Sequence, residues 1–190
     1  MRAFVALPIS DELKQAVGRV QGDLRSRLPP HAIRWTAPHQ VHVTLRFLGG
    51  VNSEAVGALG LALDGACRTV QPLELSLEEF GCFPHLRRPR VLWLGLKGDL
   101  EPLQHLQVLV SDAVAPFAAS TEDRTFSPHV TLGRLRDAPE REAGSISRAL
   151  AGFSVGRLGA WQAGCVELLE SRTGPAGAVY TQLGRFRLGT

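Results

Sequence analysis

The tetrapeptide His42-Val43-Thr44-Leu45 occurs a second time in the chain, as His129-Val130-Thr131-Leu132. Each copy lies in an apolar, β-branched stretch, at 41–48 and at 126–135, and such a stretch predicts a buried strand. Because side chains alternate along a strand, the histidine and threonine of each copy share one face, and the valine and leucine share the other. If the two strands face each other across a groove, two imidazoles and two hydroxyls meet there. That set of groups suits phosphate ester chemistry.

The repetition favours a functional interpretation of these histidines over a structural one. A lone histidine in a strand is more often a satisfied structural residue than a catalyst. An internal repeat usually marks a duplicated structural unit, and duplication alone needs only the apolar positions. Here both polar residues of the motif occur in both copies. We therefore interpret His42 and His129 as catalytic residues, and Thr44 and Thr131 as substrate-binding residues.

Helical and strand periodicities alternate along the chain on both sides of a loop at 80–89. Each half is predicted to contain a strand, a helix, the His-x-Thr strand, a second helix and a further strand. Short turns near the end, such as Gly174-Pro175, favour antiparallel pairing. We expect an α+β fold with two pseudo-repeated lobes of mostly antiparallel sheet, outer helices and an active-site groove between the lobes. The chain is then a single domain, 1–190, with pseudo-repeats at about 1–80 and 90–188.

The composition is that of a soluble globular protein, with 44% hydrophobic and 21% charged residues. Lys14 and Lys97 are the only lysines among 21 basic residues, so the remaining 19 are arginines. Arginine grips phosphate oxygens, which is compatible with a nucleic-acid ligand, although a GC-rich genome explains the bias equally well. The apolar stretch at 3–7 is too short for a signal sequence, and no apolar run has the length of a membrane span. We expect a cytoplasmic monomer without a membrane partner.

Two histidines divide the work of acid–base catalysis. One neutral imidazole accepts a proton from water or a hydroxyl, while one imidazolium donates a proton to the leaving oxygen on the other side of phosphorus. The two threonine hydroxyls donate hydrogen bonds to non-bridging oxygens. This scheme requires no metal and no other cofactor, and the sequence has no H-E-x-x-H motif, dense Asp cluster or P-loop. Its three cysteines, Cys67, Cys82 and Cys165, have neither the spacing of a metal site nor that of a disulfide framework.

Arginines follow both motifs. Arg46 has the strand parity of the polar residues in the first motif, so it is a candidate substrate-binding residue. Arg134 has the opposite parity from His129, and a regular strand turns it away from the groove unless a bulge intervenes at Gly133. A further group in the central loop is either a wall of the groove or solvated surface: Arg87, Arg88 and Arg90.

The paired motifs resemble the 2H phosphoesterase superfamily. Their context resembles the bacterial and archaeal RNA 2′,3′-cyclic phosphodiesterases, also called 2′-5′ RNA ligase-like proteins. The resemblance extends from residue 2 to about residue 188 and implies the 2H phosphoesterase fold. Besides the motifs and the Gly133-Arg134 that follows the second one, the stretches that carry it are Arg2-Ala3-Phe4-Val5-Ala6-Leu7, Arg34-Trp35-Thr36, Pro89-Arg90-Val91-Leu92-Trp93 and Leu169-Glu170-Ser171.

This resemblance implies metal-independent hydrolysis of a 2′,3′-cyclic phosphate, on an RNA end or a cyclic nucleotide, to a 2′-phosphate. It implies that His42 protonates the departing 3′ oxygen and that His129 activates water. It also assigns a phosphate contact to Arg134, so we expect the strand to be irregular or to end near Gly133. An RNA substrate agrees with the chemistry, because the cyclic phosphate needs the 2′ oxygen that DNA lacks.

Three other interpretations stay open at this point. Formation of a 2′-5′ bond between RNA ends uses the same residues in the reverse direction. A non-catalytic module would bind RNA ends without turnover. A metal-dependent phosphohydrolase would lose activity with a chelator and regain it with a divalent ion.

Overall fold

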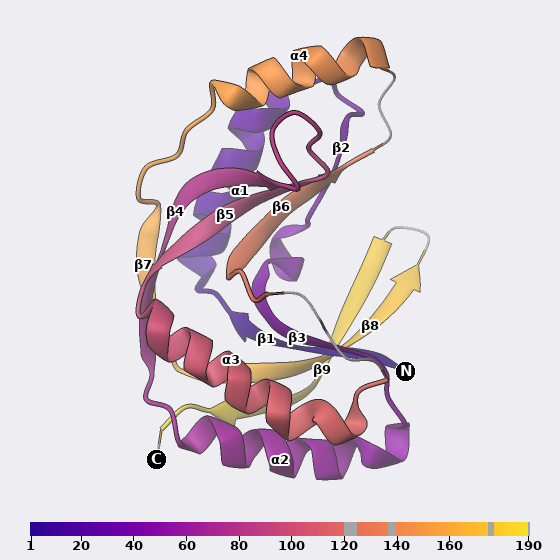
Figure 1. The fold of residues 1–190 in the computed structure, drawn as a ribbon, viewed down its shortest axis with the longest axis vertical. Coiled ribbons are helices and arrows are strands. Elements are labelled where there is room, and N and C mark those ends of the chain that lie inside the picture. The colour runs from indigo at the N-terminus through magenta and orange to yellow at the C-terminus, as the bar shows by residue number, and fades with distance from the viewer. Residues whose placement is uncertain (120–124, 137–139, 175–176, 190) are drawn as a thin grey trace.

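The computed structural model describes residues 1–119, 125–136, 140–174 and 177–189 (Figure 1). Its helices are α1 (Asp11–Arg27), α2 (Val56–Arg68), α3 (Leu100–Val114) and α4 (Glu140–Ala151), with short 3₁₀ turns η1 (Pro38–Gln40), η2 (Ser53–Ala55) and η3 (Ala115–Phe117). Its strands are β1 (Arg2–Pro8), β2 (Ile33–Trp35), β3 (His42–Gly50), β4 (Leu73–Phe83), β5 (Val91–Gly98), β6 (His129–Leu135), β7 (Gly159–Ala163), β8 (Cys165–Gly174) and β9 (Gly177–Arg187).

The strands within the described residues form one sheet in the order β7-β4-β5-β6-β3-β1-β8-β9, and β2 pairs with β6 beside this path. Every pairing in it is antiparallel. The α+β class and the antiparallel sheet predicted from the sequence are confirmed. The expected turn at Gly174-Pro175 extends into residues outside the described ranges. No helix in the described part of the chain combines the length and the hydropathy needed to cross a membrane.

Strands of the two predicted repeats are interleaved in this sheet. β4, from the first repeat, lies between β5 and β7, while β8, from the second repeat, pairs with β1. Each half of the sheet therefore contains strands from both halves of the chain. The single domain and its repeat boundaries at about 1–80 and 90–188 stay a prediction.

The two motif strands are neighbours at the centre of the sheet. β3 and β6 pair antiparallel through a single residue pair, Val43 with Val130. The two motif strands therefore share hydrogen bonds within one sheet, and their polar residues meet on its concave face. The valines at the centre of the two motifs lie opposite each other, so a pseudo-twofold relation passes between them.

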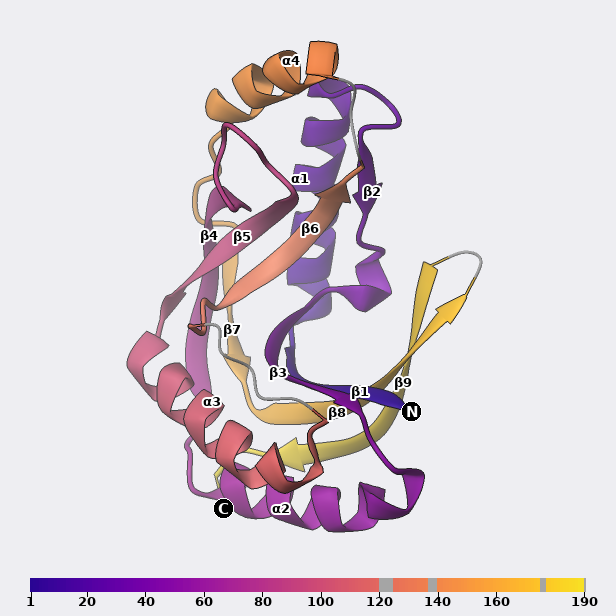
Figure 2. The same cartoon turned by 45° about the vertical axis from the view of Figure 1, so that its right-hand side comes forward.

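The helices and the motif side chains lie on opposite faces of the sheet. One hydrophobic cluster joins the sheet to residues from all four helices, such as Leu13, Leu63, Leu106 and Ile146. A second, much smaller cluster of Phe4, Ala6 and Leu169, with Tyr180 packed against it, is separate from that core. Figures 1 and 2 show the sheet curling so that the helices lie outside the curve. The outer helices predicted from the sequence are confirmed.

A β-bulge follows the threonine in each motif strand. In β3, Thr44 lies opposite Ala6 and Arg46 lies opposite Val5, so Leu45 is the extra residue. In β6, Thr131 lies opposite Trp93 and Gly133 lies opposite Leu92, so Leu132 is the extra residue. The two bulges occupy the same position of the two motifs. Each one reverses the parity of the residues that follow it.

A glutamine from an outer helix binds the carbonyl of each bulge residue. Gln21 of α1 is 3% exposed, and its Nε2 donates to the carbonyls of Leu132 and Thr36, both at 2.8 Å. Gln107 of α3 donates to the carbonyl of Leu45 at 3.4 Å. Carbonyls at a bulge leave the regular ladder, and a buried carbonyl without a donor is costly. The helices therefore stabilise the irregularity as well as cover the sheet.

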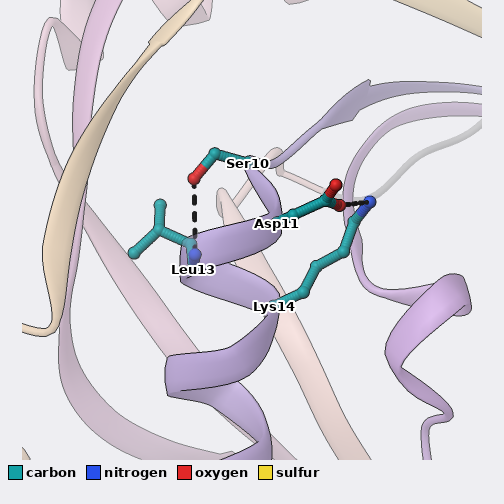
Figure 3. A network of polar contacts seen from close by, with 4 residues as sticks. All are labelled: Ser10, Asp11, Leu13 and Lys14. Atoms are coloured by element: carbon teal, nitrogen blue, oxygen red, sulfur yellow. Dashed lines mark hydrogen bonds and ion pairs between the residues drawn. The ribbon is translucent and has the colours of Figure 1, made fainter.

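The sequence favours Ser10 as the N-cap of α1, and the structure agrees. The hydroxyl of Ser10 accepts a hydrogen bond from the backbone N–H of Leu13, and Lys14 forms an ion pair with Asp11 at 2.8 Å (Figure 3). A capping oxygen and an acidic first turn both complement the free N–H groups of the helix. The end of β1 is thereby followed at once by a helix that returns across the outer face.

Other local predictions were wrong. The sequence favours Ser53 and Asp99 as caps of α2 and α3, but Ser53 begins η2. Asp99 occupies the N-cap position of α3, yet its carboxylate accepts from the backbone N–H of Glu74 and does not cap the helix. The loop predicted at 80–89 is shorter, because β4 continues to Phe83 in pairing with β5. Tertiary partners explain both differences, since the carboxylate and the strand end each find a hydrogen-bond partner distant in sequence.

We predict that Gln21→Leu lowers the free energy of unfolding by about 1–3 kcal/mol, because it removes the side-chain donor to the buried carbonyl of Leu132 and the part-buried carbonyl of Thr36. Gln15→Leu is the matched control, since Gln15 is an exposed residue of the same helix. Its effect should stay within about 0.5 kcal/mol. Urea denaturation followed by circular dichroism measures both. Equal stability of the two variants would contradict a role for Gln21 in holding the bulge.

Candidate active site

The sheet places the four polar motif residues on one face. Because Val43 and Val130 are opposed and point to the core, the residues on either side of them point to the other face. These residues are His42 and Thr44 on β3 and His129 and Thr131 on β6, all partly exposed. The histidines are a diagonal pair, and a regular ladder separates such residues by about 7–8 Å. The structure thus brings together all four residues on the concave face.

His42 is held by its own strand and by aromatic neighbours. Its Nε2 lies 3.1 Å from the hydroxyl of Thr44, and its ring lies 4.9 Å from that of Phe4 and 5.6 Å from that of Tyr180. Burial lowers the pKa of His42 to about 4, a hydrogen bond to the backbone of Gln40 opposes this, and the charge of His129 adds a smaller decrease. At neutral pH the imidazole of the free protein is therefore uncharged.

His129 has a similar environment in the other half of the sheet. Its Nδ1 lies 2.7 Å from the carbonyl of Ser127, so Nδ1 carries a proton and Nε2 of the neutral ring is an acceptor. Burial lowers the pKa of His129, the bond to Ser127 opposes this, and the charge of Arg134 lowers it further. Each histidine is thus bonded to the backbone two residues before it, which orients both rings in the same way.

Arg134 joins this face through the bulge in β6. On β5, Val91 and Trp93 share one face of the strand. Val91 lies opposite Arg134 and Trp93 lies opposite Thr131, so Arg134 and Thr131 share that face as well. The irregularity expected near Gly133 is confirmed. Arg134 is exposed, and its charge lowers the pKa values of both His129 and Tyr180 relative to burial alone. A guanidinium therefore lies within electrostatic range of one catalytic candidate.

Arg46 is placed differently from the sequence expectation. The bulge in β3 sets it opposite Val5, a core residue, and its exposed fraction is only 8%. The parity argument that put Arg46 beside His42 is wrong, because it assumed a regular strand. By pseudo-symmetry, the β3 residue equivalent to Arg134 is Phe47, which lies opposite Phe4 and is 53% exposed. The two pseudo-equivalent positions therefore differ: a guanidinium occupies the one on β6 and an aromatic ring occupies the one on β3.

Aromatic residues surround both histidines, and of these the sequence offered only Phe83 and Trp93, as rings that could stack on a base. Phe4 and Tyr180 contact each other with ring centroids 5.0 Å apart, and both contact the His42 ring. Phe83 and Trp93 lie 5.1 Å and 6.4 Å from the His129 ring. Nothing in the motif spacing pointed to Tyr180, which reaches His42 from β9. Phe4 reaches His42 because it shares the β1 parity of Ala6, which lies opposite Thr44.

Trp93 belongs to this site and not to the helix-covered core. Its indole lies directly over Gly81, where an added Cβ would be 2.2 Å from the ring. The glycine thus allows a large ring to lie flat on the strand beside His129. The sequence favours Trp93 as a core residue, and its position opposite Thr131 and beside His129 corrects this interpretation.

The four motif residues and Arg134 supply two imidazoles, two hydroxyls and a guanidinium. Among the residues that the structure describes, no group of three or more His, Cys, Asp or Glu side chains has the arrangement of a metal site. Two imidazoles on one face can move protons on opposite sides of a bound group. A neighbouring guanidinium and two hydroxyls can hold anionic oxygens. The arrangement fits transfer reactions at a phosphate diester.

Comparisons with known proteins agree with this chemistry. The family model described as LigT like Phosphoesterase matches residues 7–93 and 96–180, so each matched segment contains one motif. The chain is 28% identical over 188 residues to the RNA 2′,3′-cyclic phosphodiesterase of Methanothermobacter thermautotrophicus, with 99% of each protein covered. It is 34% identical over 140 residues to the protein of that name from Escherichia coli, with 73% of each covered.

Solved structures show the same fold. The chain superposes on E. coli LigT complexed with 3′-AMP with a TM-score of 0.75 and 29% identity, covering 100% of this chain and 98% of the other. A crystal structure described as a phosphoesterase gives a TM-score of 0.77 at 28% identity with the same coverage. The curled sheet, the two motif strands at its centre and the family match over both halves lead to one conclusion: the chain belongs to the LigT-like phosphoesterase family.

Proposed function

We propose that this protein hydrolyses 2′,3′-cyclic phosphates at RNA ends and leaves 2′-phosphates. The observation that carries the proposal is the diagonal pair of histidines on the face opposite the core, on either side of the Val43–Val130 pair. Relatives named RNA 2′,3′-cyclic phosphodiesterase that match almost the whole chain support the substrate. The reaction uses no metal in this proposal, and the protein works as a cytoplasmic monomer.

The cyclic phosphate lies between the two rings. One imidazole protonates the departing 3′ oxygen while the other removes a proton from the attacking water, so the in-line geometry uses both sides of phosphorus. Following the family resemblance, His42 is the acid and His129 is the base. The hydroxyls of Thr44 and Thr131 donate hydrogen bonds to the non-bridging oxygens, and Arg134 binds their charge. Arg46 has no part in this scheme, because its register directs it to the other face.

Substrate binding supplies the protonation state that the free site lacks. Burial lowers the pKa of both histidines, so both rings are neutral in the free protein at pH 7. A phosphodiester anion between them favours their charged forms and raises both pKa values. His42 therefore takes up its proton as the substrate binds. Productive protonation is in this way coupled to the presence of a phosphate.

The direct test is incubation with a short RNA ending in a 2′,3′-cyclic phosphate in the presence of EDTA, with identification of the product end by mass spectrometry and phosphatase mapping. We expect a 2′-phosphate at an undiminished rate. A 2′-5′-linked product on addition of RNA with a 5′-hydroxyl would instead favour ligation. Loss of turnover in EDTA that a divalent ion restores would contradict the metal-free proposal.

His42→Ala and His129→Ala should each lower kcat by about 10²–10⁴, because each removes one proton transfer. Both variants should keep the far-ultraviolet circular dichroism spectrum of the wild type, since the side chains are on the face away from the core. His39→Ala is the matched control, because His39 is exposed on η1 three residues before His42. Near wild-type turnover by either motif variant would exclude paired-histidine catalysis.

The pH dependence of kcat/KM should be bell-shaped with its optimum below pH 6.5. The free-protein pKa values of both histidines lie below their usual 6.5, and activity requires one ring charged and one neutral. Arg134→Gln removes a charge that lowers the pKa of His129, so the limb that belongs to His129 should move to higher pH. Arg136→Gln, an exposed arginine just beyond β6, should leave the profile unshifted. An optimum above pH 7 in the wild type would contradict the assigned burial effect.

A further inference from the structure

A surface hollow lies beside the candidate active site, at the turn between β4 and β5. It is lined by Phe83, Pro84, Arg88, Arg90 and Val91. Two observations connect it with the histidines. The ring of Phe83 lies 5.1 Å from the ring of His129, and Val91 pairs with Arg134 on the neighbouring strand. Two residues that line the hollow therefore neighbour residues on the β6 side of the site.

The lining combines an aromatic ring with positive charge. Phe83 is half-buried, and its ring is fixed edge-on to His129 and 5.2 Å from Trp93. Arg88 and Arg90 are exposed guanidinium groups on the turn that follows, and none of the lining residues is acidic. Aromatic platforms beside cations are the physical basis of single-stranded nucleic-acid binding, since one holds a base and the other a phosphate.

The geometry of an RNA end determines which nucleotide reaches this hollow. The cyclic phosphate terminates the strand on its 3′ side, and in the proposed reaction it is already bound by the histidines and Arg134. The next phosphate along the strand is the one on the 5′ oxygen of the terminal ribose. A second set of arginines next to the site matches that second phosphate in charge.

We propose, on the basis of the proposed function, that the hollow is a subsite for the phosphate and base that precede the terminal nucleotide. Arg88 and Arg90 bind the internucleotide phosphate, and the ring of Phe83 contacts the base of the nucleoside that precedes the terminal one. The protein thereby prefers an RNA end over a nucleoside 2′,3′-cyclic phosphate. Phe83 also contacts the ring of His129, so a base bound on Phe83 lies next to the residue that activates water.

The test compares cytidine 2′,3′-cyclic phosphate with a dinucleotide ending in the same cyclic phosphate. Wild-type kcat/KM should be about tenfold higher for the dinucleotide, as expected for charge-assisted hydrogen bonds to one phosphate. Arg88→Gln combined with Arg90→Gln should remove this preference and leave kcat/KM for the mononucleotide unchanged. A dinucleotide with a neutral methylphosphonate linkage should lose the preference with the wild type. The single variant Arg88→Gln should lose part of the preference for the dinucleotide, and it leaves Arg90 unchanged.

Arg87→Gln is the matched control, because Arg87 is exposed in the same turn but does not line the hollow. It should keep the dinucleotide preference. Equal use of the two substrates by the wild type, or an equal loss on both in the double variant, would overturn the subsite while leaving the proposed hydrolysis intact.

Equilibrium binding separates failure of the subsite from failure of the proposed function. The probe is a fluorescent dinucleotide with a terminal 2′-phosphate, measured by anisotropy at two salt concentrations. Weaker binding by the double variant, with a smaller salt dependence than the wild type, supports the subsite even if no turnover is seen. Unchanged affinity and salt dependence overturn it whatever the activity of the protein.

Discussion

The pairing of Val43 with Val130 is the contact on which the candidate site depends. It is the one residue pair that joins β3 to β6 in the described structure, and so it joins the two halves of the sheet. Because both valines point to the helix-covered core, the histidine and threonine beside each of them must point to the concave face. Hydrophobic burial of two small side chains thus determines where two imidazoles lie. A register shift of one residue would turn the histidines into the core.

The bulges convert this symmetric arrangement into an asymmetric site. Both motif strands bulge at the leucine of the motif, and a glutamine from an outer helix binds the carbonyl of each bulge. The same geometry then presents different residues: Arg134 on one side and Phe47 on the other. Of these two equivalent positions, only the one on β6 holds a cation. The pseudo-twofold frame supplies the paired acid and base, and its broken symmetry orients the ligand.

Burial has opposing effects on the histidines. It fixes the rings against aromatic neighbours and the backbone, which is favourable for positioning. It also lowers their pKa values, which leaves the free site without the charged imidazole that an acid requires. An anionic ligand removes this difficulty, because its charge favours protonation. The same low-polarity environment thereby discriminates in favour of phosphate-bearing ligands.

The sequence by itself determined the local features of this protein. The motif repeat located both catalytic candidates, the helical periodicities located the outer helices, and the polar start of α1 was correct down to the oxygen of Ser10. The family resemblance also required an irregularity near Gly133, which the bulge in β6 confirms. These features depend on contacts between residues close together along the chain, or on residue types that one chemistry demands.

The tertiary structure decided everything that depends on register between distant strands. It made β3 and β6 neighbours in one sheet, turned Arg46 toward the core, and brought Tyr180 and Phe83 to the histidines. Strand parity assumes regular alternation, and a single extra residue reverses it, so no rule of spacing within one strand could place the arginines. The partners of a strand lie far along the chain, and their register follows from packing the whole sheet against its helices.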